Sequence, residues 1–269
     1  MYIFYLFLSL LALWYLVVFL SYRLSWNKIP NAKNKNDKDF VSVIVACRNE
    51  EGNIANLIQQ IKTQNFDKER FEMIAVNDHS TDTTLQILEK EVSIWDKLKV
   101  VCLNEEEVGK KSALEKGISF AKGDIILCTD ADCSVGRNWI ATIVNYFADE
   151  KIKMVSAPVL FENKKGIFQQ LQSLEFLSLI GSGAAAIGRG KSIFCNGANL
   201  AYRKSVFLEV NSLDNNIASG DDVFLMHEIK QKYANGIAFA KQKEAIVKTS
   251  SESNISGFIN QRKRWAAKS

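Results

Sequence analysis

Hydrophobic residues follow two alternating periods along the first part of the chain, and this pattern predicts an α/β sheet. Residues 41–46 form a continuous, largely β-branched run of strand length, and after Asn53 the apolar residues recur at helical spacing. The same strand-then-helix order continues to residue 159. Further strands are predicted over 71–76, 98–103, 125–129 and 154–159, and further helices over 83–92, 112–121 and 139–147. Buried strands that alternate with helices indicate a mostly parallel, Rossmann-like sheet with helices on both faces.

The second half of the chain has a less regular pattern. It predicts helices over 167–187, 222–233 and 255–265, a strand and turn over 194–202, and short strands over 237–239 and 246–249. The apolar stripe of the segment 167–187 favours a helix in the core. Contact of this helix with a bilayer surface is the alternative.

The first 22 residues carry no charge and are rich in Leu, Phe, Val and aromatic residues. A helix of this length covers the roughly 30 Å hydrocarbon layer, so residues 1–22 are predicted to form a transmembrane helix. A cleavable signal peptide is the alternative, but the chain lacks the basic leading region and a small-x-small cleavage site before Arg23. Positive residues lie only on the C-terminal side of the span, which predicts that the rest of the chain lies on the cytoplasmic side of the inner (plasma) membrane.

Composition changes at Arg23, where the chain turns to Asn, Lys and Asp, and residues 23–39 are predicted to form a solvated linker. This linker carries most of the net charge of +4. A basic segment beside a membrane span favours a lipid surface and argues against a nucleic-acid partner. Residues 40–269 are enough for one large domain. The five cysteines include no C-x-x-C pair, so the sequence indicates neither a disulfide framework nor a zinc site.

Polar residues follow three of the predicted strands at the point where each strand ends, over 46–50, 77–82 and 129–132. Ligands of open parallel sheets bind beyond the carboxyl ends of the strands, so these segments are predicted to open onto one site. Asp130 and Asp132 are separated by one alanine, and such carboxylates suit a Mg²⁺ or Mn²⁺ ion that phosphate oxygens also hold. A solvated turn is the alternative for this common tripeptide.

Six segments in this order resemble motifs of the inverting glycosyltransferases of family 2, which have the A-type glycosyltransferase fold. They are an opening strand with a P-x-x-N-E-like loop, V-D-D-x-S-x-D, G-K-x-x-A-L-N, D-x-D, G-E-D and Q-x-x-R-W, at residues 41–50, 76–82, 109–114, 129–132, 220–222 and 261–265. The sequence departs from these motifs at Cys47-Arg48, Asn77, Glu115 and Asp221.

The resemblance implies a role for each matching residue. Asp78 would contact the nucleobase, usually uracil, and Asp130 the ribose and the metal shell, while Asp132 would bind the metal directly. Lys110 would lie near the nucleotide, and a solvated lysine at a helix start is its alternative. Asp222 would be the general base that takes a proton from the acceptor hydroxyl, because an ordinary Asp pKa near ~3.9 keeps this group ionised at neutral pH.

Gln261, Arg264 and Trp265 share one face of the last predicted helix. Arg264 can pair with diphosphate oxygens and Trp265 can form an apolar wall for a sugar ring, so all three are expected to bind the nucleotide sugar. A basic helix that lies on anionic lipid is the alternative, and we expect different faces of this C-terminal interfacial helix to serve both purposes. The basic residues that suggest lipid contact are Arg262, Lys263 and Lys268.

These motifs imply inverting, metal-dependent transfer of a sugar from a nucleotide sugar, expected to be a UDP-sugar, to a hydroxyl of a glycan or lipid-linked acceptor, as in polysaccharide biosynthesis. Residues 40–160 would form the donor half and residues 161–269 the acceptor half. One alternative is a nucleotidyltransferase on a related fold, which would release pyrophosphate. The other is a non-catalytic, membrane-bound protein that binds nucleotide sugars. Polymer-forming relatives have further spans after the Q-x-x-R-W helix, so we expect this chain to be part of a longer protein. An enzyme with a single span is the alternative.

Overall fold

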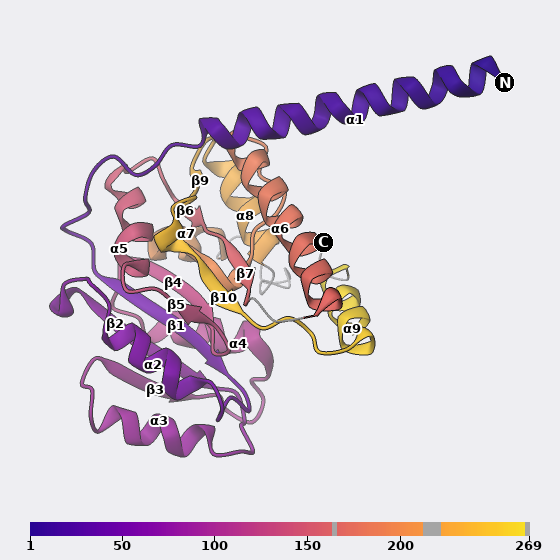
Figure 1. Cartoon of the computed structure of the whole chain (residues 1–269). Helices are drawn as coiled ribbons and strands as arrows, with labels where there is room; N and C mark the ends of the chain where they lie inside the picture. The colour runs from indigo at the N-terminus through magenta and orange to yellow at the C-terminus, as the bar shows by residue number, and fades with distance from the viewer. Residues whose placement is uncertain (163–165, 212–221, 267–269) are drawn as a thin grey trace.

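A seven-stranded sheet with the order β3-β2-β1-β4-β8-β6-β9 lies at the centre of the structure (Figure 1). The structure is a computed structural model that describes residues 1–162, 166–211 and 222–266. Strand β8 runs antiparallel to its neighbours β4 and β6, and the other neighbouring pairs are parallel, so the predicted mostly parallel sheet is confirmed. The strands are β1 (Val41–Cys47), β2 (Phe71–Asn77), β3 (Leu98–Cys102), β4 (Ile125–Asp130), β6 (Met154–Ser156), β8 (Leu200–Arg203) and β9 (Ile237–Phe239).

Helices cover both faces of this sheet, as predicted. Val43 and Val45 of β1 belong to the core formed with α2, α3 and α5, whereas Ile44 belongs to the core on the other face with α4, α7 and α8. Successive side chains of a strand point to opposite faces, so a strand that is buried on both faces needs a continuous apolar run. The helices are α2 (Ile54–Lys62), α3 (Thr84–Val92), α4 (Gly109–Phe120), α5 (Trp139–Val144), α7 (Lys204–Asn211) and α8 (Asp222–Lys232).

A second sheet, which the sequence pattern did not predict, joins the two halves of the domain. Its order is β5-β10-β7, with β5 at Ser134–Val135, β10 at Val247–Thr249 and β7 at Val159–Phe161. The single strand predicted over 154–159 is therefore wrong, since this segment is divided between β6 and β7. Pro158 lies at the break and cannot donate a ladder hydrogen bond.

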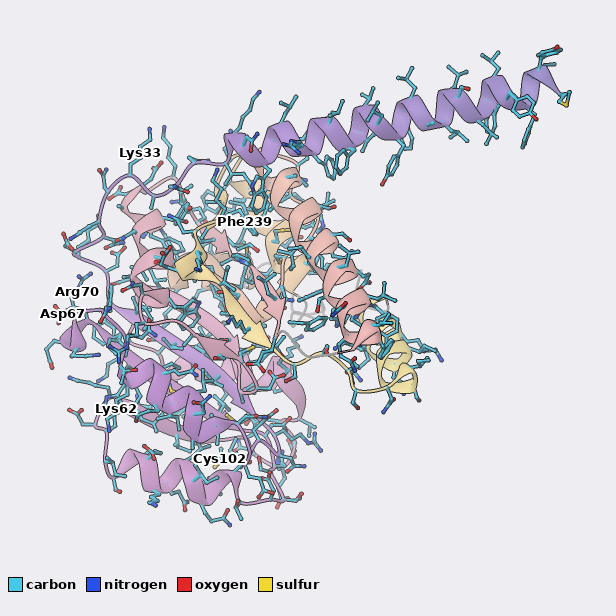
Figure 2. The ribbon with its side chains drawn as sticks, in the orientation of Figure 1. Lys33, Lys62, Asp67, Arg70, Cys102 and Phe239 are labelled. Atoms are coloured by element: carbon cyan, nitrogen blue, oxygen red, sulfur yellow. The ribbon has the colours of Figure 1, made fainter. Side chains whose placement is uncertain are left out.

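The N-terminal helix α1 (Tyr2–Lys28) extends beyond the predicted span and projects from the domain (Figure 1). Its length and composition would allow it to cross a membrane, and the same holds for α6 (Ile167–Gly188), which is partly buried. The last turn of α1 packs on the domain, where Ser25 is buried and the Trp26 ring lies 6.1 Å from that of Phe239, which Figure 2 labels beneath this end of α1. Residues 23–28 are thus helical, and their assignment to the linker is wrong.

The rest of the predicted linker is also partly buried, so the expectation of a fully solvated segment is wrong. Asn36 and Asp39 are buried, and the Asn36 Nδ2 group donates a hydrogen bond to Asp39 Oδ2 at 2.7 Å. Arg203 Nη1 lies 3.5 Å from the same oxygen, and Arg70 donates to the Asn36 carbonyl oxygen at 3.1 Å. These polar contacts fasten residues 36–39 to the edge of the domain.

Candidate active site

Three loops meet around Asp78 at the carboxyl edge of the large sheet. Asp78 is only 4% exposed. Its Oδ2 accepts a hydrogen bond from the Gly109 amide at 3.1 Å and lies 3.6 Å from Arg48 Nη1, while its Oδ1 lies 3.1 Å from His79 Nδ1. Asp78 therefore joins the loops that follow β1, β2 and β3.

Unusual backbone conformations shape the same loops. Gly109, Asn49 and His79 have φ values of 93°, 56° and 53°. Glycine adopts positive φ without steric cost, and asparagine tolerates it better than most residues. The Asn49 side-chain oxygen also accepts a hydrogen bond from the Thr81 backbone amide at 2.8 Å. The backbone amide of Asn49 donates a hydrogen bond to Ser80 Oγ at 3.1 Å. These bonds hold the first two loops together.

Lys110 pairs with one of the predicted carboxylates and interacts electrostatically with another. Its Nζ forms an ion pair with Asp130 Oδ1, although its side chain is 40% exposed. Burial acts to lower the pKa of Lys110, but the charges of Asp130 and Asp222 outweigh this effect and hold the pKa above its ordinary value. Lys110 is therefore a charged partner of both aspartates, which distinguishes it from a lysine that is only solvated.

Asp222 is the first residue of α8 and packs over Gly197. A β-carbon at residue 197 would lie 2.0 Å from Asp222 Oδ2, so the half-buried carboxylate occupies the space that a side chain would need. The backbone carbonyl of Asp222 also accepts a hydrogen bond from Cys195 Sγ at 3.1 Å. The segment before β8 thus fixes the start of α8. The neighbouring Asp221, which replaces the family's Glu, lies outside the described residues.

Asp132 is exposed in the loop between β4 and β5. Its Oδ2 accepts a hydrogen bond from Thr249 Oγ1 at 2.8 Å, and its Oδ1 lies 3.7 Å from Cys133 Sγ. Thr249 is the last residue of β10, so this bond connects the predicted donor half with the predicted acceptor half. Thr249 was not predicted as a site residue. A threonine at the end of a short strand has no local sequence pattern that would indicate a hydrogen bond to Asp132.

The acidic residues at this edge fit a divalent cation that a ligand also holds. Burial raises the pKa of the Glu50 carboxyl. A hydrogen bond from the Asn53 side chain lowers this pKa, and the charges of Asp132, Asp130 and Asp82 raise it further. Glu50, Asp82, Asp130 and Asp132 therefore lie close enough together for their charges to interact. In the described part of the chain, no group of three or more His, Cys, Asp or Glu side chains is arranged so that it could hold a metal ion by itself. Two aspartates that leave the remaining positions to diphosphate and water match the usual coordination of Mg²⁺.

Gln261, Arg264 and Trp265 lie on α9 (Ile255–Ala266), which packs beside the N-terminal part of α6 (Figure 1). The Trp265 ring lies 5.5 Å from that of Phe176 on α6, whereas Arg264 is exposed. Gln261 Oε1 accepts a hydrogen bond from Arg262 Nη1 at 2.6 Å. The three residues therefore have different surroundings, although the sequence placed them on one open face.

The structure thus assembles one part of the predicted site and places the other on a separate helix. Asp78 binds the amide beside Lys110, and Lys110 interacts with Asp130 and Asp222. Of the α9 residues, Trp265 packs against Phe176 of α6, while Arg264 is exposed. Arg262, which was expected to face lipid, pairs with Glu175 of α6, so that expectation is wrong. Lys268 lies outside the described residues.

Comparison of sequences identifies related proteins. A poly-beta-1,6-N-acetyl-D-glucosamine synthase from Staphylococcus aureus (strain MSSA476) is 26% identical over 250 residues, which cover 91% of this chain and 58% of that protein. A beta-monoglucosyldiacylglycerol synthase from Nostoc sp. is 33% identical over 141 residues, which cover 52% of this chain and 30% of that protein. The chain therefore spans little more than half the length of the poly-beta-1,6-N-acetyl-D-glucosamine synthase.

Solved structures share the fold. The mannosyltransferase PcManGT from Pyrobaculum calidifontis, in complex with GDP-Man and Mn²⁺, has a TM-score of 0.71 at 20% identity and covers 95% of this chain and 71% of that chain. Residues 1–349 of S. aureus TarS, in complex with UDP-GlcNAc, have a TM-score of 0.59 at 22% identity, with 80% and 59% coverage. This likeness concerns the fold and confirms the predicted A-type glycosyltransferase architecture.

The family assignment comes from a sequence match to a family model. Residues 42–210 of the 269 match the model described as glycosyl transferase family 2. The matched region contains the loops around Asp78, the helix start at Lys110 and the Asp130–Asp132 pair, whereas Asp222 and α9 lie beyond it. Since the match covers more than half of the sequence, the chain belongs to glycosyl transferase family 2.

Proposed function

We propose that the protein transfers a sugar from a nucleotide sugar to an acceptor hydroxyl, with inversion at the anomeric carbon. The observation that carries this proposal is the electrostatic coupling of Asp222, Lys110 and Asp130 at the carboxyl edge of the sheet. This coupling supports a proton acceptor close to the groups that would hold the diphosphate of a donor. A family 2 domain with this arrangement has the parts for a single displacement.

In the proposed reaction, Asp222 takes the proton of the acceptor hydroxyl. The oxygen attacks the anomeric carbon on the side opposite the nucleoside diphosphate, which leaves with the electrons of the broken carbon–oxygen bond. Asp222 lies at the N-terminus of α8, where the helix dipole favours a negative charge. The positive charge of Lys110 also interacts favourably with the Asp222 carboxylate.

Stabilisation of the departing diphosphate is the main electrostatic task of such a transfer. Mg²⁺ or Mn²⁺, held by Asp132 and Asp130, would supply positive charge for the diphosphate oxygens. Lys110 adds positive charge beside Asp130. Arg264, which is exposed on α9, would pair with the diphosphate in a bidentate manner. Gln261 and Trp265 would complete the donor site.

The proposed donor is a UDP-sugar. Asp78 would accept a hydrogen bond from the N3–H group of uracil, because a carboxylate has about four acceptor positions and retains capacity beside its bonds to Gly109 and His79. TarS, which shares the fold, was solved with UDP-GlcNAc, and this makes UDP-GlcNAc the first donor to test. The mannosyltransferase was solved with GDP-Man, so GDP-Man is the matched comparison.

We further propose that the domain works at the cytoplasmic face of the inner (plasma) membrane on a glycan or lipid-linked acceptor. Figure 1 shows α6 and α9 on the side of the domain toward which α1 extends. Exposed apolar side chains on these two helices would lie against lipid, with α1 as the anchor. These side chains are Ile167, Leu171, Leu174 and Leu177 of α6 and Ile255 and Ile259 of α9.

A donor screen tests the proposed function. Full-length protein in detergent is incubated with UDP-GlcNAc, other UDP-sugars or GDP-Man, with and without Mn²⁺ and a membrane extract as acceptor source, and the released nucleotide is identified. We expect release of UDP that requires the metal. Release of pyrophosphate would support the nucleotidyltransferase alternative. Donor binding without any turnover would support the non-catalytic alternative.

A further inference from the structure

We propose that Arg262 and Glu175 are positioning residues that hold α9, and with it Gln261, Arg264 and Trp265, against α6. The role of α9 in donor binding rests on the proposed function. The contact between the two helices is a property of the structure and can be tested separately.

Arg262 forms a bidentate ion pair with Glu175. Its Nε donates to Glu175 Oε1 at 2.9 Å, and its Nη2 donates to Glu175 Oε2. Two parallel hydrogen bonds fix the orientation of a guanidinium group, which the point charge of a lysine would not do. Exposed ion pairs contribute little to stability. The Arg262 side chain is 20% exposed and the Glu175 side chain is 41% exposed, so the role we assign to the pair is to orient α9 through its bidentate geometry.

Aromatic rings of α9 cover the same guanidinium group. The Arg262 Cζ atom lies 4.4 Å from the ring centroid of Phe258 and 4.1 Å from that of Trp265. Cation–π contacts of this kind gain strength when the cation is partly removed from water. Trp265 in turn lies against Phe176 of α6, and the Phe258 ring lies 6.0 Å from that of Phe168. The Arg262 guanidinium group therefore connects two aromatic rings of α9 to the Glu175 carboxylate of α6.

The pair also fixes the rotation of α9 about its axis. Positions 258, 262 and 265 recur at helical spacing on one face, and this face is turned to α6. Gln261 lies beside this face and accepts a hydrogen bond directly from Arg262, and Arg264 follows on the same helix. A rotation of α9 would redirect all of these groups, and misplacement of about 1 Å can cost roughly 10² in rate.

The chain before α9 is tied to the same face of α6. Gln172 Nε2 donates to the Glu252 carbonyl oxygen at 3.0 Å, and the Glu252 amide donates to Gln172 Oε1 at 3.2 Å. Gln172 and Glu175 are neighbours on one face of α6. The Gln172 bonds hold the entry to α9, whereas the Glu175–Arg262 pair holds the helix itself.

Charge reversal in the full-length protein tests this proposal. Arg262→Glu and Glu175→Arg each place like charges together, and the double variant restores an opposite pair without the cation between the rings. Amide hydrogen exchange of residues 255–265 and turnover of UDP-GlcNAc with Mn²⁺ are measured. We expect each single variant to raise α9 exchange and lower turnover at least tenfold, and the double variant to recover at least threefold in both. Lys263→Glu, an exposed charge reversal on the same helix, should leave α9 exchange within twofold of wild type.

Two results would overturn the proposal: single variants with wild-type α9 exchange, or a double variant that recovers nothing. Amides of β1 and β2 report whether each variant remains folded. If a reversal unfolds the domain, Arg262→Lys and Glu175→Gln decide by the same criterion, and unchanged α9 exchange then disproves the positioning role. If wild-type protein transfers no sugar while the exchange pattern follows the prediction, the proposed function fails and the positioning contact stands.

Discussion

The carboxylate of Asp222 keeps its position because residue 197 has no side chain. A β-carbon at Gly197 would lie 2.0 Å from Asp222 Oδ2 and 2.4 Å from its Cγ atom, so one of the two residues must move. We expect Gly197→Ala to lower the transfer rate at least tenfold while the affinity for UDP with Mn²⁺ changes little. The matched control is Gly181→Ala in α6, where nothing lies within 4 Å, and its rate should stay within twofold of wild type. Equal rates for the two variants would contradict the assigned position of Asp222.

Asp222→Asn removes the proton acceptor but conserves the size of the side chain. A positioned general base is typically worth 10² to 10⁴ in rate, or roughly 3 to 5 kcal/mol of barrier, so transfer should fall by about that factor. Binding of UDP with metal, measured by calorimetry, should be nearly unchanged. Asp221→Asn should cost much less. If Asp221→Asn is the more damaging change, the base is Asp221, and if neither change slows transfer, the general-base mechanism is wrong.

Asp132→Ala removes one of the two carboxylates that would hold the cation. We expect UDP binding to lose its dependence on Mn²⁺ in a calorimetric titration, because diphosphate and metal would bind together at the proposed site. Asp96→Ala removes an exposed carboxylate beside β3 and serves as the control, with metal dependence unchanged. A metal dependence that survives in Asp132→Ala would place the cation elsewhere.

At the scale of helices and strands, the end of α1 belongs to the domain and its beginning does not. Ser21 Oγ accepts a hydrogen bond from Arg189 Nη1 at 3.0 Å, and Ser25 lies against Gly188. Removal of residues 1–20 should therefore shift the protein to the soluble fraction with UDP binding intact. Removal of residues 1–30 should also lower the melting temperature, because the buried Ile29 is lost. A shortened protein that resists high salt and alkaline washing of membranes would show that α6 and α9 are themselves embedded.

The elements that the sequence predicted well are those whose pattern depends on local burial. Strands β1, β2 and β4 are buried on both faces and appear as apolar runs. Strand β5 contains two residues, which is too short for any periodicity, and it was not predicted. Strand β10 was predicted as the short strand over 246–249, but its pairing with β5 and β7 was not. The helix α7 was missed for a similar reason, since it follows β8 without a turn signal.

The same limit applies to the candidate site. Asp78 and Asp130 follow strands and match motifs, so their place at the carboxyl edge could be predicted. Thr249 and Glu175 matter through partners far along the chain, Asp132 and Arg262, and no local pattern encodes such pairs. Trp265 was placed on the correct helix, but its contact with Phe176 depends on how α9 packs.

For the whole molecule, bound nucleotide and metal should stabilise the fold. A ligand at 100 times its dissociation constant adds about 2.7 kcal/mol to the free energy of unfolding. For a domain of this size each kcal/mol corresponds to roughly 2–4 °C, so saturating UDP with Mn²⁺ should raise the melting temperature by about 5–11 °C. GDP with Mn²⁺ at the same concentration should give a clearly smaller shift. Equal shifts would mean that the site does not distinguish uracil from guanine.

The helix α6 contacts the end of α1 at its C-terminus and contacts α9 near its N-terminus. Gly188 lies against Ser25 and Ile29, and Glu175 binds Arg262. A helix rises 1.5 Å per residue, so about 20 Å of continuous helix separates these two contacts. A transmembrane helix tilts when the hydrocarbon layer becomes thinner. If α1 spans the membrane, its tilt would move α6, and α6 would in turn move α9. If α1 acts as the proposed membrane anchor, the acyl chain length of the surrounding lipids would become a variable of the proposed sugar transfer, and reconstitution in short-chain and long-chain bilayers would give different transfer rates.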